Sequence, residues 1–271
     1  MALSKAADAL RLKVIKMGHE AGSGHMGGSL SCVEILHTLY GRIMNVDPQK
    51  PDWPQRDRFI LSKGHAAPIL YAVLSSRGFF PEELLWTLRD LNSPLQGHPC
   101  MFKLPGIDMS TGSLGLGLSC ALGMALSIRM DKSGAHVYAL LGDGELQEGQ
   151  NWEAFMAICS FGVTNLTPII DLNGVQLDGP TEEIQPNQTQ MVDKLKGFGL
   201  RVFQADGHHE EQLFRVITEA AHCGIPHAVI ARTVKGKGVS FMEGQAAWHG
   251  KPMTDADYHA AKAQIEERLL S

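Results

Sequence analysis

The chain of 271 residues has little of what would place it in several other classes of protein. Charged residues make up only 20% of it, and the net charge of -5 excludes the basic surface that nucleic-acid binding requires. No apolar run approaches the ~18 residues of a membrane span. The N-terminus lacks the apolar core and cleavage site of a signal peptide. We therefore expect neither nucleic acid nor membrane among the partners.

Cysteines are few: the five in the chain are scattered, odd in number and never spaced as Cys-x-x-Cys. Their distribution argues against a disulfide framework and against a zinc site. We expect small buried thiols in a reducing compartment, and hence a cytoplasmic protein.

Glycine is abundant by contrast, with 29 residues, and several of its short groups adjoin a histidine or an aspartate. Glycine occurs where the backbone must approach another group closely or adopt positive φ. The grouping therefore indicates a binding cleft built from several loops.

Apolar runs alternate along the chain with segments of helical periodicity. Strands are expected over residues 58–62, 136–141, 166–172, 200–205 and 226–232, and helices over 2–21, 31–43, 66–77, 114–130, 150–161 and 254–270. Another helix should follow the fourth strand, with Asp206 helping to start it. The helix over 114–130 should be buried on most sides. This alternation predicts an α/β fold, an open, mostly parallel sheet with helices on both faces, and residues 1–271 form a single domain.

Polar groups follow two of these strands where each strand ends. Gly142-Asp143-Gly144 comes directly after the strand over 136–141, and Asn173 follows the next strand, thirty positions after Asp143. Open parallel sheets bind ligands at the carboxyl ends of their strands, so the two side chains should converge there. Carboxylate, amide and backbone carbonyl oxygens suit Mg²⁺, and a diphosphate with one water would complete an octahedral site.

This spacing resembles the fingerprint of thiamine diphosphate enzymes, and further segments resemble the transketolase family in particular. In the order of that family they are SGHMGGSLS at 23–31, DRFILSKGH at 57–65, GHP at 97–99, TGSLGLG at 111–117, GDGELQEG at 142–149, KGKGV at 235–239 and WHG at 248–250. Two places depart from the family pattern. Met26 stands where proline is usual, and Ser113 and Leu116 replace proline and glutamine.

The resemblance implies a role for each matched position. Four histidines should line the substrate channel, as hydrogen-bond donors and as bases, since the unperturbed pKa of an imidazole lies near neutrality: His25, His65, His98 and His249. Contacts with thiamine diphosphate are expected from His65, Gly112, Leu114, Asp143, Gly144, Glu148, Asn173 and Val175. The Val175 carbonyl should join Asp143 and Asn173 as a ligand of Mg²⁺, or of Ca²⁺ or Mn²⁺ in its place. Glu148 resembles an acid that lies at the subunit interface and couples active sites.

The resemblance also implies a transferase that moves a two-carbon ketol unit from a ketose or ketose phosphate to an aldose or aldose phosphate. The domain that supplies the cofactor-activating glutamate in full-length relatives has no counterpart here. We therefore expect an N-terminal subunit that functions with a C-terminal transketolase subunit, in a two-plus-two heterotetramer. Its pathway is the pentose phosphate route or the catabolism of an unusual sugar.

Two alternatives remain at this point. One is the α subunit of a 2-oxoacid dehydrogenase decarboxylase component, which shares the metal motif and the split architecture. The histidine blocks argue against it, because decarboxylation of a 2-oxoacid involves no sugar hydroxyls. The other is a non-catalytic paralogue that retains cofactor binding, against which the intact Asp143, Asn173 and histidines argue.

Overall fold

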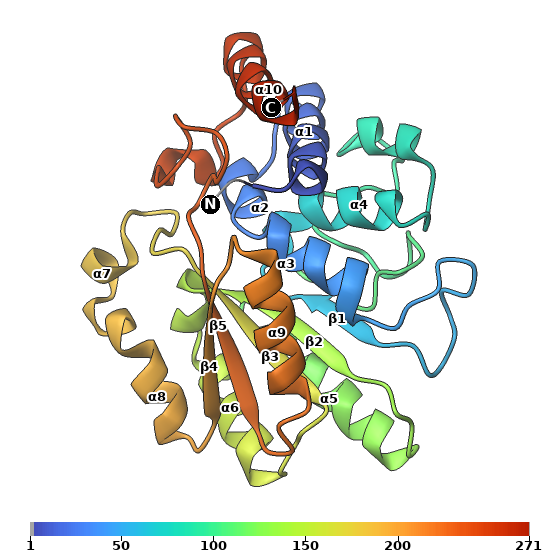
Figure 1. Ribbon diagram of the computed structural model, residues 1–271, viewed down its shortest axis with the longest axis vertical. Helices are drawn as coiled ribbons and strands as arrows, with labels where there is room; N and C mark the ends of the chain where they lie inside the picture. Colours follow the sequence, from blue (N-terminus) through green and yellow to red (C-terminus); the bar gives the residue numbers. More distant parts are fainter. Residues whose placement is uncertain (1–2, 271) are drawn as a thin grey trace.

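The computed structural model describes the backbone of residues 3–270, and the side chains of all of these except residues 188 and 189. Five strands form one sheet in the order β1-β2-β3-β5-β4, and each pair of neighbours is parallel (Figure 1). They are β1 (Arg58–Leu61), β2 (Val137–Gly142), β3 (Leu166–Leu172), β4 (Arg201–Asp206) and β5 (His227–Arg232). Each begins and ends within one residue of its predicted bounds. The predicted α/β class is confirmed.

The strand side chains alternate between two apolar layers, one on each face of the sheet. In β2, Tyr138 and Leu140 belong to one buried cluster, whereas Ala139 and Leu141 belong to the other. All six residues of β2 are buried, as its uninterrupted apolar run predicted. The edge strand β4 is largely exposed.

Helices cover both faces of the sheet. On one side lie α3 (Val33–Thr38), α4 (Ala67–Ser76) and α9 (Glu210–Ala221), and on the other α5 (Leu116–Met130), α6 (Gly149–Ser160) and α8 (Met191–Gly197). Helix α1 (Lys5–Glu20) packs against α4 and against α10 (Asp255–Leu270), so the two ends of the chain lie side by side (Figure 1). Residue 2, where the first helix was predicted to begin, lies outside the described residues.

Three predictions about helices need correction. The single helix expected over 31–43 ends at Thr38 and continues as a π-helical turn, Leu39–Ile43. Asp206 does not cap α9, because the turn at 207–208 intervenes; the cap is His209, whose Nδ1 accepts from the Gln212 amide at 3.4 Å.

Helix α5 is exposed on one side, whereas its sequence predicts burial on most sides. Its buried residues are Gly117, Leu118, Ala121, Leu122 and Ala125, which form one stripe toward the sheet. Leu116 and Met130 are 40% and 81% exposed. The apolar composition suggested burial all round, but within the described residues the main contacts of the helix are with the sheet and α6.

Some short helices were missed because glycine or polar residues dominate them: α2 (Met26–Leu30) and α7 (Thr181–Ile184). In α2, a Cβ at Gly27 would lie 2.9 Å from the Trp248 carbonyl oxygen. The helix therefore requires glycine where a distant loop approaches its backbone, and helix propensity alone does not reveal this.

The cysteines are all free thiols, as predicted, but only Cys32 is fully buried. Cys120 is exposed on the uncovered side of α5, so the expectation of buried thiols is wrong for it. Among residues 3–270, none of the helices combines the length and apolar character that crossing a bilayer requires.

Candidate active site

A cavity of about 260 Å³ lies at the carboxyl ends of β2 and β3, where ligands of parallel sheets bind. Many of the predicted site residues line it: His65, Leu114, Asp143, Gly144, Asn173, Val175 and His249. Gly28, Lys63 and Lys235 contribute to the same wall. The wall of the cavity thus combines glycine backbone, oxygen atoms that could bind a metal, lysine ammonium groups and imidazole rings.

Asp143 follows β2 and is 2% exposed. Its carboxylate accepts hydrogen bonds from the amides of Gly144 (2.8 Å) and Gly174 (2.5 Å). Burial, followed by the nearby charge of Asp171, raises the pKa of Asp143 to about 6. A divalent cation would stabilise the ionised form, so the environment of this carboxylate suits a metal ligand.

The other two proposed ligands follow β3. The Asn173 side-chain oxygen accepts from the Val175 amide at 3.1 Å, and its nitrogen donates to Asp171 at 3.3 Å. The Val175 carbonyl accepts from Lys235 Nζ at 2.8 Å and retains a second lone pair. Within the described residues, no three His, Cys, Asp or Glu side chains gather as a metal site. The predicted set is of another kind, because only Asp143 in it is a carboxylate.

A buried ion pair supports the floor of the cavity. Lys63 and Asp171 are 1% and 0% exposed, and the Lys63 ammonium donates to the Asp171 carboxylate. Ser31 Oγ donates to the same carboxylate at 2.6 Å. Burial opposes the charge on Lys63, but the attraction of Asp171 outweighs it and raises the pKa of the lysine. The pair holds the Lys63 ammonium in place beneath the site.

Lys235 supplies a second ammonium, 2% exposed, which donates to the Val175 carbonyl and lies 2.9 Å from His249 Nδ1. Burial, followed by repulsion from Lys63, lowers the pKa of Lys235 to about 8. Two neighbouring ammonium groups in a buried cavity would be relieved by a polyanion. A diphosphate is such a ligand.

The four predicted histidines form one cluster beside this cavity. The ring of His25 lies 5.4 Å from those of His65 and His249 and 6.3 Å from that of His98, measured between centroids. The rings of His65 and His249 are 5.0 Å apart. Segments that lie more than two hundred residues apart in the sequence therefore converge on one place.

Burial shifts the pKa values of all four histidines below that of an unperturbed imidazole. Burial, followed by the charge of Arg89, lowers the pKa of His25 to about 4, and burial followed by Lys235 lowers that of His249 to about 3. The pKa values of His65 and His98 are lowered as well, mainly by burial. At pH 7 all four are neutral, so each offers one donor and one acceptor. Within the described residues, His25 Nδ1 is buried without a hydrogen-bond partner.

Comparison with known proteins identifies this arrangement. The family model described as "Transketolase, thiamine diphosphate binding domain" matches residues 3–266. The chain belongs to the transketolase family. The chain is 42% identical to the 6-deoxy-6-sulfo-D-fructose transketolase subunit SqwG of Clostridium sp. strain MSTE9, over 98% of this chain and 96% of that protein.

Further relatives divide into two kinds. An apulose-4-phosphate transketolase subunit of Phocaeicola vulgatus is 41% identical over 96% of this chain and 92% of its own length. Human transketolase is 42% identical over 93% of this chain, which covers only 40% of that protein. The crystal structure of Campylobacter jejuni transketolase matches with a TM-score of 0.89 and 30% identity, covering 96% of this chain and 42% of that chain. These matches favour a transketolase over the 2-oxoacid dehydrogenase subunit.

Two further predicted cofactor contacts lie outside the cavity wall. Gly112 has φ of +146°, and a Cβ there would lie 3.1 Å from the His98 ring, so its backbone adjoins the histidine cluster. Glu148 is exposed and precedes α6, next to Gly115 of the glycine-rich loop. Their roles stay predictions, as do those of the residues that line the cavity.

The acid that organises this transketolase loop is Glu145, which sequence reasoning missed. It is 2% exposed and accepts from Ser62 Oγ (2.5 Å) and from the amides of Gly115 (3.0 Å) and Gly142 (3.1 Å). It therefore ties the glycine-rich loop to the ends of β1 and β2. Lys63, Asp171 and Lys235 were also missed; Lys63 and Lys235 stand in the quoted family segments, but only tertiary contacts reveal their function.

Proposed function

We propose that residues 1–271 form the thiamine-diphosphate-binding domain and N-terminal subunit of a two-subunit transketolase. It transfers a two-carbon ketol unit from a ketose or ketose phosphate to an aldose or aldose phosphate. The observation that supports this most directly is the convergence of Asp143, Asn173 and Val175 with the four neutral histidines at one edge of the sheet.

The donor set and charge of the cavity suit thiamine diphosphate with a hard divalent cation. Asp143, Asn173 and the Val175 carbonyl would hold Mg²⁺, or Ca²⁺ or Mn²⁺, and Lys235 would meet the diphosphate. Gly144 permits close approach of the main chain, and Leu114 offers apolar contact. The cofactor supplies a nucleophilic carbon and an electron sink, which the side chains of the protein lack.

The histidines act on the sugar through hydrogen bonds. Because all four are neutral, each can donate to an oxygen on which charge develops, and a ring whose acceptor nitrogen is free can also accept from a sugar hydroxyl. His25 Nδ1, buried without a protein partner among the described residues, is available for such a bond. His249 is oriented by Lys235, whose Nζ contacts its Nδ1 and leaves Nε2 for the substrate.

We propose a donor that carries a terminal anion. Arg89 is exposed, has φ of +65°, and its charge acts on both His25 and His98. It therefore stands beside the histidine cluster where the far end of a sugar would lie. The relatives named above act, by their names, on a sulfo-sugar and on a sugar phosphate, which supports this class of substrate.

A C-terminal transketolase subunit would complete the site, in a two-plus-two heterotetramer. Leu114 and Leu177 line the cavity yet are 36% and 61% exposed, and Leu116 at the start of α5 is 40% exposed. Apolar side chains around a cavity mouth are typical of a surface that another chain covers. The relatives of similar length, whose names describe them as transketolase subunits, support such an assembly. Free thiols support the cytoplasmic location that we propose.

Reconstitution with a C-terminal transketolase subunit tests this function. Ketol transfer from a ketose phosphate should be absent with this chain alone and should appear with the complex in the presence of thiamine diphosphate and Mg²⁺. Full activity of the chain alone would contradict its assignment to a two-subunit enzyme. A complex that binds the cofactor but transfers no ketol group would indicate the non-catalytic paralogue, and 2-oxoacid decarboxylation would indicate the other enzyme class.

A further inference from the structure

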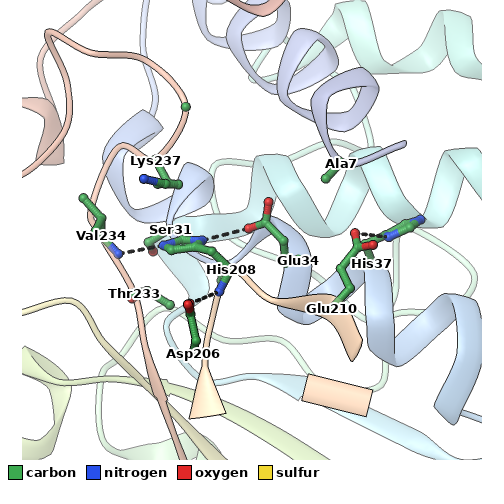
Figure 2. A network of polar contacts seen from close by, with 12 residues as sticks. Ala7, Ser31, Glu34, His37, Asp206, His208, Glu210, Thr233, Val234 and Lys237 are labelled. Carbon is green, nitrogen blue, oxygen red and sulfur yellow. Dashed lines mark hydrogen bonds and ion pairs between the residues drawn. The ribbon is translucent and has the colours of Figure 1, made fainter. Parts of the chain in front are cut away.

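A buried carboxylate outside the cavity joins two residues that hold the backbone on either side of Lys235. Glu34 of α3 is 1% exposed. Its Oε2 accepts from His208 Nδ1 at 2.9 Å, and its Oε1 accepts from Arg11 Nη2 at 2.5 Å. Figure 2 shows His208 between Glu34 and Val234, with the Glu34 carboxylate pointing toward its ring.

His208 forms the first link to the segment that carries Lys235. Its Nε2 accepts from the Val234 amide at 2.8 Å. Because Nε2 accepts a hydrogen bond, the ring proton of His208 is on Nδ1, which donates to the Glu34 carboxylate. The carboxylate thus stabilises the tautomer that the Val234 amide needs as its acceptor. The backbone around His208 is held too, since Asp206 Oδ1 accepts from the His208 amide at 2.9 Å (Figure 2).

Arg11 forms the second link, on the other side of Lys235. It is fully buried in α1, and its Nε donates to the Lys237 carbonyl at 2.9 Å. The close approach of Arg11 to this backbone depends on Gly238, which has φ of +90°. A Cβ at this position would lie 2.7 Å from Arg11 Nε. Glu34 stays ionised between the two: burial would raise its pKa, but the hydrogen bond of His208 and the charge of Arg11 lower it.

Lys235 needs such restraint because Lys63 lies in the wall of the same cavity, and the two ammonium groups repel each other. The side chain of lysine has a flexible stem of four carbons, so its ammonium group could turn away from a like charge. A fixed backbone restricts where the ammonium can go, so its contacts with the Val175 carbonyl and His249 are kept before any ligand arrives.

We propose that Glu34, His208 and Arg11 are positioning residues that hold residues 234–237, and thereby keep the Lys235 ammonium at the diphosphate end of the cavity. This inference rests on the proposed function, because it assigns the cavity to a diphosphate. None of the three residues lines the cavity. They act through Lys235 and not on the substrate.

The same region offers a matched control. His37, also of α3, pairs its Nδ1 with Glu210 Oε1 at 2.9 Å (Figure 2). Like His208 it is a histidine bonded to a glutamate, but within the described residues it has no hydrogen bond to residues 233–239. Replacing His37 thus removes a pair of the same chemistry without touching the segment that carries Lys235.

The test compares His208→Phe, His208→Gln and His37→Phe by amide hydrogen exchange of the peptide spanning residues 233–239, in the full chain without cofactor. Phenylalanine keeps the ring but has no acceptor, whereas the glutamine oxygen can replace Nε2. Exchange in this peptide should be at least tenfold faster in H208F, and near wild type in H208Q and H37F. Equal exchange in H208F and wild type would overturn the proposal.

Cofactor binding is then measured by calorimetry, with thiamine diphosphate and Mg²⁺, in complexes containing the C-terminal subunit. The dissociation constant should rise about tenfold in H208F, and H208Q should restore most of the affinity. Native affinity in H208F would overturn the cofactor role of the three residues. A wild-type complex that binds no thiamine diphosphate would instead overturn the proposed function, while hydrogen exchange would still decide whether His208 holds the segment.

Discussion

Clustered histidines occur at both edges of the sheet, and the two groups differ in how their ring nitrogens are used. At the amino edge, the Nε2 atoms of His136 and His227 lie 2.8 and 2.7 Å from the hydroxyl of Thr167, and His227 Nδ1 lies 2.9 Å from the Ile225 carbonyl. That carbonyl requires a proton on Nδ1, so Thr167 donates to His227 and accepts from His136. The rings of this group are thus held by hydrogen bonds within the protein.

At the carboxyl edge, the histidines face one another and a cavity, and His25 Nδ1 lacks a partner among the described residues. Burial lowers the pKa of His136 to about 3, the same value as for His249. A lowered pKa therefore reports burial and does not distinguish a binding site from a structural network. The unpaired His25 Nδ1, beside a cavity with two lysine ammonium groups in its wall, makes that distinction among the described residues.

The largest difference between the two edges should appear on removal of the proposed metal ligands. Asp143→Ala and Asn173→Ala should each weaken binding of thiamine diphosphate with Mg²⁺ by more than about 100-fold, or about 2.7 kcal/mol, because the diphosphate loses its cation. Titration calorimetry on the assembled complex measures this. The melting temperature of the cofactor-free chain should hardly change, and near-native affinity in both variants would contradict the metal assignment.

The second comparison concerns catalysis. His25→Ala and His249→Ala should lower kcat/KM for a ketose phosphate by at least about tenfold, roughly 1.4 kcal/mol of transition-state stabilisation, with a smaller effect on cofactor affinity. His65→Ala should affect both quantities because His65 lines the cavity. The amino-edge variant His136→Phe is the control and should leave kcat/KM unchanged; a loss as large as that of His25→Ala would remove the distinction between the edges.

At the amino edge the expected effect is on stability. Thr167→Val leaves two buried ring nitrogens without their hydroxyl partner, and should lower the free energy of unfolding by about 1–3 kcal/mol. Urea denaturation of the cofactor-free chain measures this change. Ketol transfer by the assembled enzyme should remain near wild type at a temperature where both are folded. A loss of activity without a loss of stability would show that this network serves function.

The smallest effect should be a pH dependence of cofactor affinity, caused by Lys235 at the carboxyl edge. The pKa of Lys235 is about 8 in the cofactor-free chain, and a bound diphosphate would raise it. Affinity for the cofactor should therefore be full below pH 8 and fall a few-fold as the pH rises above 8, since protonation must then accompany binding. Calorimetry between pH 7 and 9.5 should show this decline in wild type but not in Lys235→Met. An unchanged decline in the variant would assign it to another group.

Local sequence was sufficient for the strands and for the residues that follow them. An apolar run such as that of β2 has to be covered on both faces, and chain order then brings Asp143 and Asn173 to one edge. The exposed side of α5 could not be predicted, because apolar composition does not tell which partner covers a helix. The same holds for α2, whose glycines are explained only by the loops that approach them.

The sequence by itself determined the α/β class, the family and the residues that could bind a diphosphate and its metal, since these follow from short-range patterns and from motifs in a fixed order. Only the tertiary structure decided that the four histidines are neutral, that Lys63 and Asp171 form a buried pair, and that Glu34 reaches His208. Glu34 and His208 are 174 positions apart. Protonation and contact at that separation depend on burial and on how α3 and α9 pack on the sheet, which no local pattern specifies.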